Sequence, residues 1–312
     1  MALLLKLSGT PDQLARSLCK EIGCRIEVPH TKIFPDGEQY LRVEPHLFEN
    51  ESSIIIVQSM YPEQDRKWIE LLLALEVVCS HFNGKVLVVI PYLAYARQDR
   101  RFLPGEALSL KSLLKSLCTW CIDGIITVDA HKPEIVKEYL EEQGVEYINI
   151  LPFSYMATKG GVRDEIDFVL SPDKGALPRA KELATTISRP YGYLEKHRDR
   201  VTGDIVVEEK YLEVRGKTVV IVDDIISTGG TLARAVELIK KLGALRVIAI
   251  VTHSLLVGNA EEKFRNAHLD MLLTANTVDV RTKGLIDVRI VDVGPLVAQH
   301  LRKSALGRSF YE

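Results

Sequence analysis

The stretch that decides the fold is Val219-Val220-Ile221-Val222-Asp223-Asp224-Ile225-Ile226-Ser227-Thr228-Gly229-Gly230-Thr231. The apolar run at 219–222 predicts a buried strand that ends in two carboxylates, and a loop of small residues then opens a helix over 232–242. Glycines let a backbone approach an anion closely, and the start of a helix directs N–H groups and a positive dipole end towards it. The segment therefore predicts a phosphate-binding loop.

The two aspartates in this segment, Asp223 and Asp224, indicate what the rest of the ligand is. Carboxylates repel a phosphate, so we expect them to face sugar hydroxyls or a metal ion. The hydroxyls of Ser227, Thr228 and Thr231 add further donors beside the loop. These residues together predict a sugar-phosphate site, and the alternative is a capped helix that follows an acidic strand end.

Apolar runs short enough for buried strands recur along the chain, at 3–7, 54–57, 86–90, 125–128, 168–170, 219–222 and 247–251. Their continuous Val, Ile and Leu character predicts parallel sheets that are covered on both faces. Helical spacing follows several of them, as over 65–82. After the first run, Thr10 is expected to cap, and Pro11 to open, a helix that stops near Gly23. The fold class is therefore α/β.

The two halves of the chain resemble each other. Residues 84–90 are similar to residues 216–222, and the strands that follow end in Asp129-Ala130-His131 and in Thr252-His253. This spacing favours a duplicated α/β domain over a chance likeness of two generic strand–helix units. We expect an N-terminal domain over 1–146, a C-terminal domain over 147–290 and a tail over 291–312 that packs back on the first domain.

The composition excludes several classes of protein. The 312 residues include 40 basic and 42 acidic side chains, a net charge of −2, so a general nucleic-acid or membrane-surface binder is not expected. The longest apolar run, near 68–76, is too short to span a bilayer and contains acids. A charge at Lys6 interrupts the N-terminal apolar run too early for a signal peptide, so we expect a cytoplasmic protein.

Five cysteines all lie in the first half of the chain. Because their number is odd and no secretion signal is present, we expect reduced, structural thiols. Cys118-Thr119-Trp120-Cys121 has the spacing of a redox or metal motif. It ends a helical pattern, however, whereas a thioredoxin-type pair opens a helix.

Further polar segments lie beside predicted strands. Phe34-Pro35-Asp36-Gly37-Glu38 suits a hairpin turn, and 96–101 follows a strand at the end where α/β proteins bind ligands. The basic residues at 97–101 could hold phosphates or form a solvated cluster, and a lone histidine such as His131 is more often structural than a ligand. The segment 170–176 is either an ordinary turn or a diphosphate cradle, and 193–200 is a dense charge run of the kind usually found on solvated loops.

The segment 219–231 resembles the ribose-phosphate-binding motif of type I phosphoribosyltransferases. Together with 34–38, 96–101 and 128–131, in this order, it resembles the ribose-phosphate pyrophosphokinases, also called phosphoribosyl pyrophosphate synthetases, over nearly the whole chain. The resemblance implies two similar domains of type I phosphoribosyltransferase-like fold, with parallel sheets flanked by helices. It also implies an enzyme that makes AMP and 5-phosphoribosyl 1-diphosphate from ATP and ribose 5-phosphate with Mg²⁺, by attack of the anomeric hydroxyl on the β-phosphorus.

The same resemblance implies roles for individual residues. The residues expected to bind ATP are Phe34, Asp36, Gly37, Glu38, Arg97, Gln98, Asp99, Arg100 and His131. Those expected to bind ribose 5-phosphate are Arg198, Asp223, Asp224, Ser227, Thr228, Gly229, Gly230 and Thr231. The implied Mg²⁺ contacts are His131 and Asp173, of which the imidazole is unusual because Mg²⁺ prefers oxygen. The implied catalytic residues, carried by a mobile loop over the triphosphate, are Lys196 and Arg198.

The loop at 227–231 is closer to archaeal members of this family than to bacterial or animal ones. In the family, the turn at 34–38 reaches the site of a neighbouring subunit, which implies a homo-oligomer with a shared ATP site and leaves dimer, tetramer or hexamer open. A phosphoribosyltransferase, or a non-catalytic regulatory paralogue, is the alternative. The first needs neither a duplicated domain nor the segments at 34–38 and 97–98, and the second would have lost site residues that are present here.

Overall fold

A computed structural model describes residues 2–198, 205–208 and 212–304. The described chain forms two compact units. The first contains residues 2–150 with two returning segments, 277–279 and 292–304, and the second contains 151–276 and 280–291. The division between Ile150 and Leu151 lies a few residues beyond the boundary proposed from the sequence.

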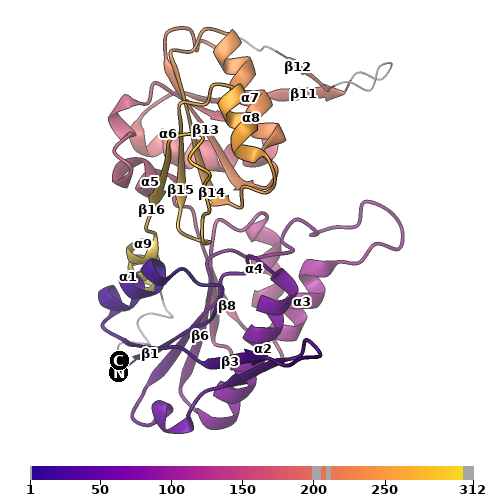
Figure 1. Cartoon of the computed structure of the whole chain (residues 1–312), viewed down its shortest axis with the longest axis vertical. Coiled ribbons are helices and arrows are strands. Elements are labelled where there is room, and N and C mark those ends of the chain that lie inside the picture. Colours follow the sequence, from indigo (N-terminus) through magenta and orange to yellow (C-terminus); the bar gives the residue numbers. More distant parts are fainter. Residues whose placement is uncertain (1, 199–204, 209–211, 305–312) are drawn as a thin grey trace. The chain divides into compact units, whose positions relative to one another are not determined.

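The first unit is built on a six-stranded parallel sheet with the order β2-β1-β5-β6-β7-β8 (Figure 1). Its elements in chain order are β1 (Ala2–Lys6), α1 (Asp12–Ile22), β2 (Arg25–Glu27), β3 (His30–Ile33), β4 (Gln39–Arg42), the 3₁₀ helix η1 (Pro45–Phe48), β5 (Ser53–Val57), α2 (Gln64–His81), β6 (Lys85–Ile90), α3 (Ser109–Leu117), β7 (Gly124–Val128), α4 (Pro133–Glu142), β8 (Glu146–Ile150) and α9 (Gly294–Lys303). The strands β3 and β4 form a separate antiparallel hairpin.

The second unit repeats this plan with the order β10-β9-β13-β14-β15-β16, again parallel. Its elements are α5 (Phe153–Lys159), η2 (Arg163–Glu165), β9 (Phe168–Ser171), η3 (Lys174–Ala176), α6 (Leu177–Ile187), β10 (Tyr191–Tyr193), β11 (Glu195–Arg198), β12 (Ile205–Glu208), β13 (Thr218–Ile226), α7 (Gly230–Lys241), β14 (Arg246–Ser254), α8 (Ala260–Asn266), β15 (Met271–Ala275) and β16 (Val288–Val291). The hairpin β11–β12 stands apart from the sheet, as β3–β4 does.

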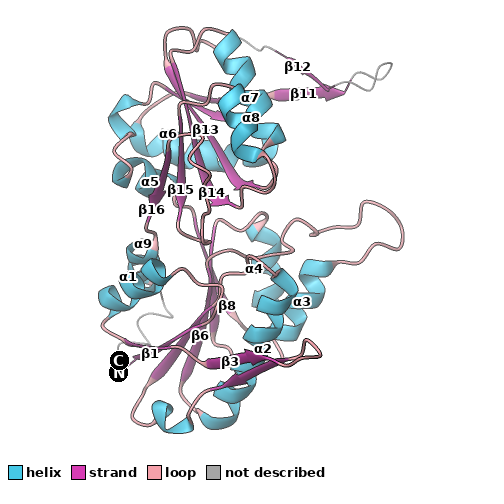
Figure 2. Ribbon diagram, in the orientation of Figure 1, coloured by secondary structure: helices cyan, strands magenta, loops and turns pink. Residues whose placement is uncertain are grey.

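Helices lie on both sides of each sheet (Figure 2). In the first unit α1 and α9 lie on one side and α2, α3 and α4 on the other (Figure 1). Right-handed crossovers explain this arrangement, because the strand order runs in one direction from β1 to β2 and in the other from β5 to β8. All residues of β5 are buried, as a strand covered on both faces requires. The predicted α/β class with parallel sheets is confirmed.

The duplication is also confirmed, but the predicted correspondence between the halves is wrong by one strand. β6 takes the fourth place in its sheet, as β14 does, whereas β13 takes the third place and corresponds to β5. The likeness between 84–90 and 216–222 misled because a Gly-Lys turn before a Val-rich run can open any buried parallel strand.

Two local predictions also need correction. β13 does not end at its two aspartates but continues through them to Ile226, which pairs with Ser254 of β14. Thr10 does not cap α1, because its hydroxyl donates to the carbonyl oxygen of Val57 at 2.7 Å and the residue is buried. Pro11 precedes α1 and Gly23, in a left-handed conformation, ends it as expected.

Helix α9, near the C-terminus, packs against α1 of the first unit. The approach is close at Gly294, where a Cβ atom would lie 2.7 Å from the carbonyl oxygen of Leu14 and also collide with the Ser17 hydroxyl. Within the described residues, no helix combines the length and apolar character needed to cross a membrane.

Candidate active site

The acidic pair lies at the carboxyl edge of the second sheet. Because β13 runs on through the pair, its carboxylates are held within the sheet rather than on a loose loop. Asp224 is buried, and its Oδ2 lies 3.3 Å from a guanidinium nitrogen of Arg179, an equally buried residue of α6. A buried carboxylate is thus matched with a buried cation, as burial of charge requires.

The ionised form of the second carboxyl group of the pair, Asp223, is disfavoured by its surroundings. Burial raises the pKa of Asp223 well above its usual range, the nearby charge of Asp224 raises it further, and the charge of Arg179 opposes both. Its Oδ1 accepts a hydrogen bond from the backbone N–H of Asp224 at 3.0 Å. A carboxylate in this position gains from a ligand that brings a cation or hydroxyl donors.

The loop after β13 is held in the shape that an anion site needs. Gly229 has φ +73°, and a Cβ atom there would lie 2.7 Å from the Phe264 ring of α8, so only glycine fits. The backbone N–H of Val257 donates to the Ser227 carbonyl oxygen at 2.9 Å, and Lys263 Nζ donates to that of Thr228 at 2.8 Å. Since α7 begins at Gly230, the N–H groups of its first turn have no acceptor within the helix.

The segment at 170–176 lies beside this loop, because β9 pairs with β13 and parallel strands end at the same edge. Asp173 Oδ1 accepts hydrogen bonds from the N–H groups of Gly175 at 2.9 Å and Ala176 at 3.2 Å, which open η3. Helix α6 follows directly and carries Arg179. The structure therefore brings Asp173, Asp223, Asp224 and the 227–231 loop to one edge of the second sheet.

Arg179 was missed by sequence reasoning, although a signal was present. The buried residues of α6 are Arg179, Ala180, Leu183 and Ala184, which have the i, i+1, i+4, i+5 spacing of one helix face. A cation on that face, six residues after Asp173, had to be paired inside the protein.

The residues expected to bind ATP lie in the first unit, in two places. The first is the turn at 34–38, the tip of the β3–β4 hairpin, which is confirmed as a turn by hydrogen bonds from Phe34 N–H to the Glu38 carbonyl oxygen at 2.8 Å and from Gly37 N–H to that of Phe34 at 2.9 Å. The tip is exposed, and Lys32 Nζ lies 4.6 Å from the centre of the Phe34 ring. The tip thus presents an aromatic ring and two carboxylates to the surroundings.

The second place is the carboxyl edge of the first sheet. Residues 97–100 belong to the long connection after β6, and His131 follows the neighbouring strand β7. The Gln98 N–H donates to the Tyr95 carbonyl oxygen at 3.0 Å, and the Arg100 guanidinium lies 4.9 Å from the centre of the Phe102 ring. Arg97 and Arg100 are exposed and Gln98, Asp99 and His131 are half-buried, so all of them are accessible to a ligand.

The implied catalytic pair falls on β11 of the second unit. The structure places the backbone of this strand, with Lys196 opposite Val207 and Arg198 opposite Ile205 of β12. The side chains of Lys196 and Arg198 lie outside the described part of the chain.

Metal ligands were expected at His131 and Asp173. Among the described residues, no group of three or more His, Cys, Asp or Glu side chains is arranged to hold a metal ion. A carboxylate oxygen such as those of Asp173 suits Mg²⁺, which often binds one or two carboxylates and substrate phosphates, whereas the imidazole of His131 does not suit it.

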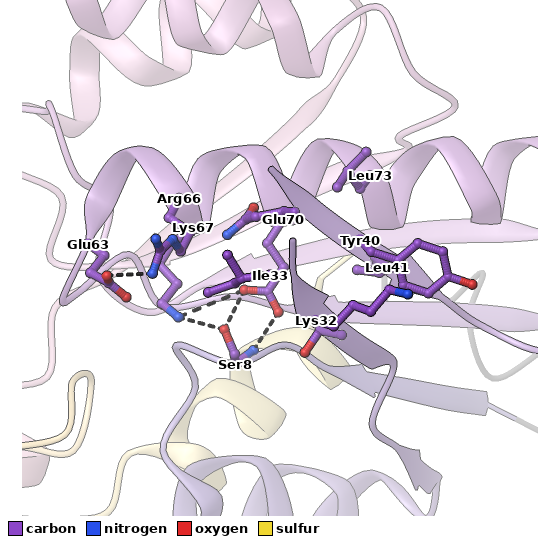
Figure 3. Close-up of a pocket in the computed structure, with 12 residues that line it drawn as sticks. Ser8, Lys32, Ile33, Tyr40, Leu41, Glu63, Arg66, Lys67, Glu70 and Leu73 are labelled. Carbon is purple, nitrogen blue, oxygen red and sulfur yellow. Dashed lines mark hydrogen bonds and ion pairs between the residues drawn. The ribbon is translucent and has the colours of Figure 1, made fainter. Parts of the chain in front are cut away.

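A further cavity in the first unit, of about 310 Å³, lies between α2 and the β3–β4 hairpin (Figure 3). Its floor holds a buried charged cluster: Lys67 Nζ donates to Ser8 Oγ at 2.6 Å and lies 3.9 Å from the Glu70 carboxylate. Glu70 accepts hydrogen bonds from the N–H of Ser8, at 2.9 Å, and from its hydroxyl. These groups satisfy one another, so the cluster is a closed structural network.

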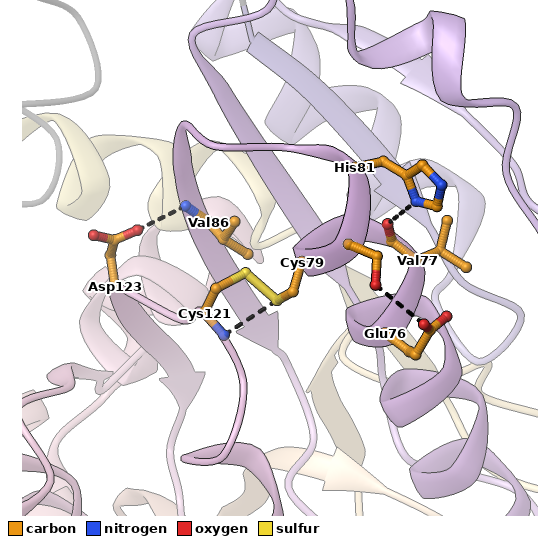
Figure 4. Close-up of a disulfide and its surroundings, with 8 residues drawn as sticks. Glu76, Val77, Cys79, His81, Val86, Cys121 and Asp123 are labelled. Carbon is orange, nitrogen blue, oxygen red and sulfur yellow. Dashed lines mark hydrogen bonds between the residues drawn. A yellow bond between two sulfur atoms is a disulfide. The ribbon is translucent and has the colours of Figure 1, made fainter.

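The expectation of reduced cysteines is wrong. A disulfide joins Cys79 to Cys121 (Figure 4). A second disulfide joins Cys19 to Cys24, and Cys118 is free. The second forms because the turn at Gly23 brings the N–H of Cys24 to the Cys19 carbonyl oxygen at 3.1 Å, and this closeness is invisible in a count of cysteines. Burial raises the pKa of the Cys118 thiol, so the Cys118–Cys121 spacing does not mark a reactive pair.

Comparisons with known proteins agree with this geometry. The family model of the N-terminal domain of ribose phosphate pyrophosphokinase matches residues 3–120, and that of the phosphoribosyl transferase domain matches 153–286. The ribose-phosphate pyrophosphokinase of Sulfurisphaera tokodaii is 41% identical over 96% of this chain and 100% of its own, and that of Saccharolobus solfataricus is 40% identical over 91% and 95%.

Among solved structures, phosphoribosylpyrophosphate synthetase from Mycobacterium smegmatis superposes with a TM-score of 0.81 at 25% identity, covering 97% of this chain and 98% of its own. The architecture of two parallel sheets flanked by helices is therefore shared with a solved structure. The chain belongs to the ribose-phosphate pyrophosphokinase family.

Proposed function

We propose that this protein transfers the diphosphoryl group of ATP to the anomeric hydroxyl of ribose 5-phosphate, forming AMP and 5-phosphoribosyl 1-diphosphate. The observation that carries the proposal is the edge of the second sheet, where the acidic pair of β13 is followed by a glycine-containing loop and the start of α7. Membership of the family supplies the reaction class, and the geometry supplies a place for each part of the sugar phosphate.

Within this proposal, the second unit binds ribose 5-phosphate. The 5-phosphate occupies the loop at 227–231, where it accepts hydrogen bonds from the first N–H groups of α7 and from hydroxyls. Asp223 and Asp224 accept hydrogen bonds from the sugar hydroxyls, and this contact is favourable because the unliganded pair is self-repelling. The hydroxyl that attacks ATP is thereby fixed in orientation.

The first unit binds ATP through Arg97, Gln98, Asp99, Arg100 and His131. The exposed hairpin tip supplies Phe34, Asp36, Gly37 and Glu38 to the ATP site of a neighbouring copy, so the active protein is at least a dimer. An aromatic ring beside carboxylates suits an adenine ring and ribose hydroxyls. We infer that the enzyme acts in the cytoplasm, where both substrates are available.

Mg²⁺ is the cofactor we propose, held by Asp173 together with phosphate oxygens, and when bound it neutralises charge on the triphosphate. Asp173 fits this role because its carboxylate is oriented by two backbone N–H groups. His131 is assigned to the nucleotide rather than to direct coordination. Lys196 and Arg198 supply the cations that stabilise charge on the transferred group.

The test is to incubate the protein with Mg²⁺, ribose 5-phosphate and ATP labelled in the β-phosphate, and to separate the products. We expect the label in the diphosphorylated sugar and none in AMP. Label in ADP together with a sugar bisphosphate would contradict the proposal. A phosphoribosyltransferase would instead consume 5-phosphoribosyl 1-diphosphate with a base and release diphosphate. The matched control is the double variant Asp223→Asn/Asp224→Asn, which should form no product at substrate concentrations that saturate the wild type.

A further inference from the structure

Arg179 occupies a position that links the two acidic segments of the second unit. It lies in the first turn of α6, which begins directly after the Asp173 turn, and it reaches the Asp224 carboxylate on β13. At 6% exposure its guanidinium is withdrawn from solvent. The ion pair therefore connects the segment after β9 to the segment after β13 at the edge where we place ribose 5-phosphate.

The cation also changes the charge balance at this edge. The charges of Asp224 and Asp173 both disfavour the ionised form of Asp223, whereas the charge of Arg179 favours it, so loss of Arg179 would remove a cation that opposes this repulsion. Without the guanidinium to hold it, the Asp224 carboxylate could take another orientation, in which it would not accept hydrogen bonds from a sugar in the same geometry. A guanidinium is suited to the opposing role because it stays charged when buried and fixes a carboxylate in orientation.

We propose that Arg179 is a positioning residue for ribose 5-phosphate, which acts through Asp224 without contacting the sugar. This inference rests on the proposed function of the second unit. It predicts that loss of the guanidinium weakens the binding of one substrate selectively. A purely structural ion pair predicts a different result, namely lower thermal stability with unchanged Michaelis constants in the protein that remains folded.

The first experiment is steady-state kinetics on Arg179→Gln and Arg179→Lys with saturating Mg²⁺. Arg179→Gln should raise the KM for ribose 5-phosphate about 10- to 100-fold, the effect of losing one charge-assisted hydrogen bond, while the KM for ATP changes less than about twofold. Arg179→Lys keeps the charge but not the planar fork, so its KM for ribose 5-phosphate should lie between those of Arg179→Gln and the wild type.

The second experiment remains decisive if Arg179→Gln does not fold. The double variant Arg179→Gln/Asp224→Asn removes both charges of this ion pair together, so it avoids the cost of removing only one of the two partners. If Arg179 acts through Asp224, the double variant should have the same KM for ribose 5-phosphate as Asp224→Asn alone. The double variant Arg179→Gln/Asp223→Asn should instead have a higher KM for ribose 5-phosphate than either single variant.

The matched control is Lys67→Gln, which removes a buried cation of the first unit that is likewise paired with an acid. It should lower the melting temperature while leaving the KM for ribose 5-phosphate within about twofold of the wild type.

An unchanged KM for ribose 5-phosphate in folded Arg179→Gln, or a double variant much worse than Asp224→Asn, would overturn the inference. Failure of the proposed function is distinguishable, because the wild type itself would then form no 5-phosphoribosyl 1-diphosphate.

Discussion

The two units have the same strand order, yet the point at which that order reverses is built differently in each. Ligands of open α/β sheets bind where the order reverses, between β1 and β5 in the first unit and between β9 and β13 in the second. In the first, Ser8, Lys67 and Glu70 close the position with their own hydrogen bonds. In the second unit, the pKa of Asp223 is raised, and the residue lies beside the 227–231 loop.

The duplicated fold thus provides a ligand position in each unit, and a few side chains determine whether a ligand can bind there. A closed network contributes to stability and has no charge left to compensate. In the second unit, by contrast, Asp223 and Asp224 repel each other and Arg179 only partly opposes this repulsion. A ligand that supplies hydroxyl donors or a cation would reduce it further.

The hairpins β3–β4 and β11–β12 occupy equivalent places, and we expect only the second to act on turnover. Lys196→Ala should lower kcat about 100- to 1000-fold, as removal of one donor to a transition-state charge typically does, with the KM for ATP changed only several-fold. The matched control is His197→Ala, since position 197 lies on the opposite strand face from 196 and 198. Both variants are measured by steady-state kinetics. If kcat falls by a similar, modest factor in both, β11 is a generic basic surface and Lys196 has no specific role in turnover.

Both disulfides lie in the first unit, so we expect them to stabilise that unit and not the second. The Cys79–Cys121 bridge closes a sequence separation of 42 residues, so Cys79→Ala/Cys121→Ala should cost about 4 kcal/mol of unfolding free energy in the first unit. The Cys19–Cys24 bridge spans only 5 residues, and its removal should cost about 2 kcal/mol. Urea unfolding with and without a reductant measures both, and equal losses would contradict the loop-length argument.

The anion loop depends on one glycine of its pair. Gly229→Ala introduces a left-handed alanine that collides with Phe264, at a cost of about 3 kcal/mol in the second unit. Gly230→Ala is the control, because a Cβ atom at position 230 meets no atom within 4 Å. Thermal unfolding should therefore separate the two variants clearly. A Gly230→Ala variant as unstable as Gly229→Ala would show that the loop shape described here is wrong.

The smallest effect expected is a gain in stability. Because the folded-state pKa of Asp223 is raised, the folded protein binds more protons than the unfolded chain above pH 3.8, and stability falls as pH rises through that window. Asp223→Asn should therefore raise Tm at pH 7 by a few degrees, and the gain should vanish below pH 3.8. Asp224→Asn should lower Tm at pH 7 because it removes the carboxylate charge that lies beside the buried Arg179 guanidinium. Shifts of the same sign would refute the assigned charge balance.

The local sequence predicted the strand–loop–helix arrangement at 219–231, because strand, glycine and helix-start signals are contained in these thirteen residues. It predicted the parallel sheets for the same reason, since buried runs of Val, Ile and Leu have few other uses. It failed where distant residues meet. The Cys79–Cys121 bridge and the Arg179–Asp224 pair join segments more than 40 residues apart, and no local pattern reports such contacts.

The duplication shows an intermediate case. The repeat was detectable, but its register was not, because β6 and β13 have the same buried-strand pattern at different places in their sheets. Thr10 shows the reverse, a strong capping signal overridden by a tertiary hydrogen bond to Val57.

The contrast between the two units is tested most directly by equilibrium binding of ribose 5-phosphate, measured calorimetrically with Mg²⁺ and a non-hydrolysable ATP analogue. We predict one site per chain, lost in Asp223→Asn/Asp224→Asn and retained with unchanged affinity in Lys67→Gln. Two sites per chain, or full binding by the double aspartate variant, would contradict the assignment of the sugar phosphate to the second unit.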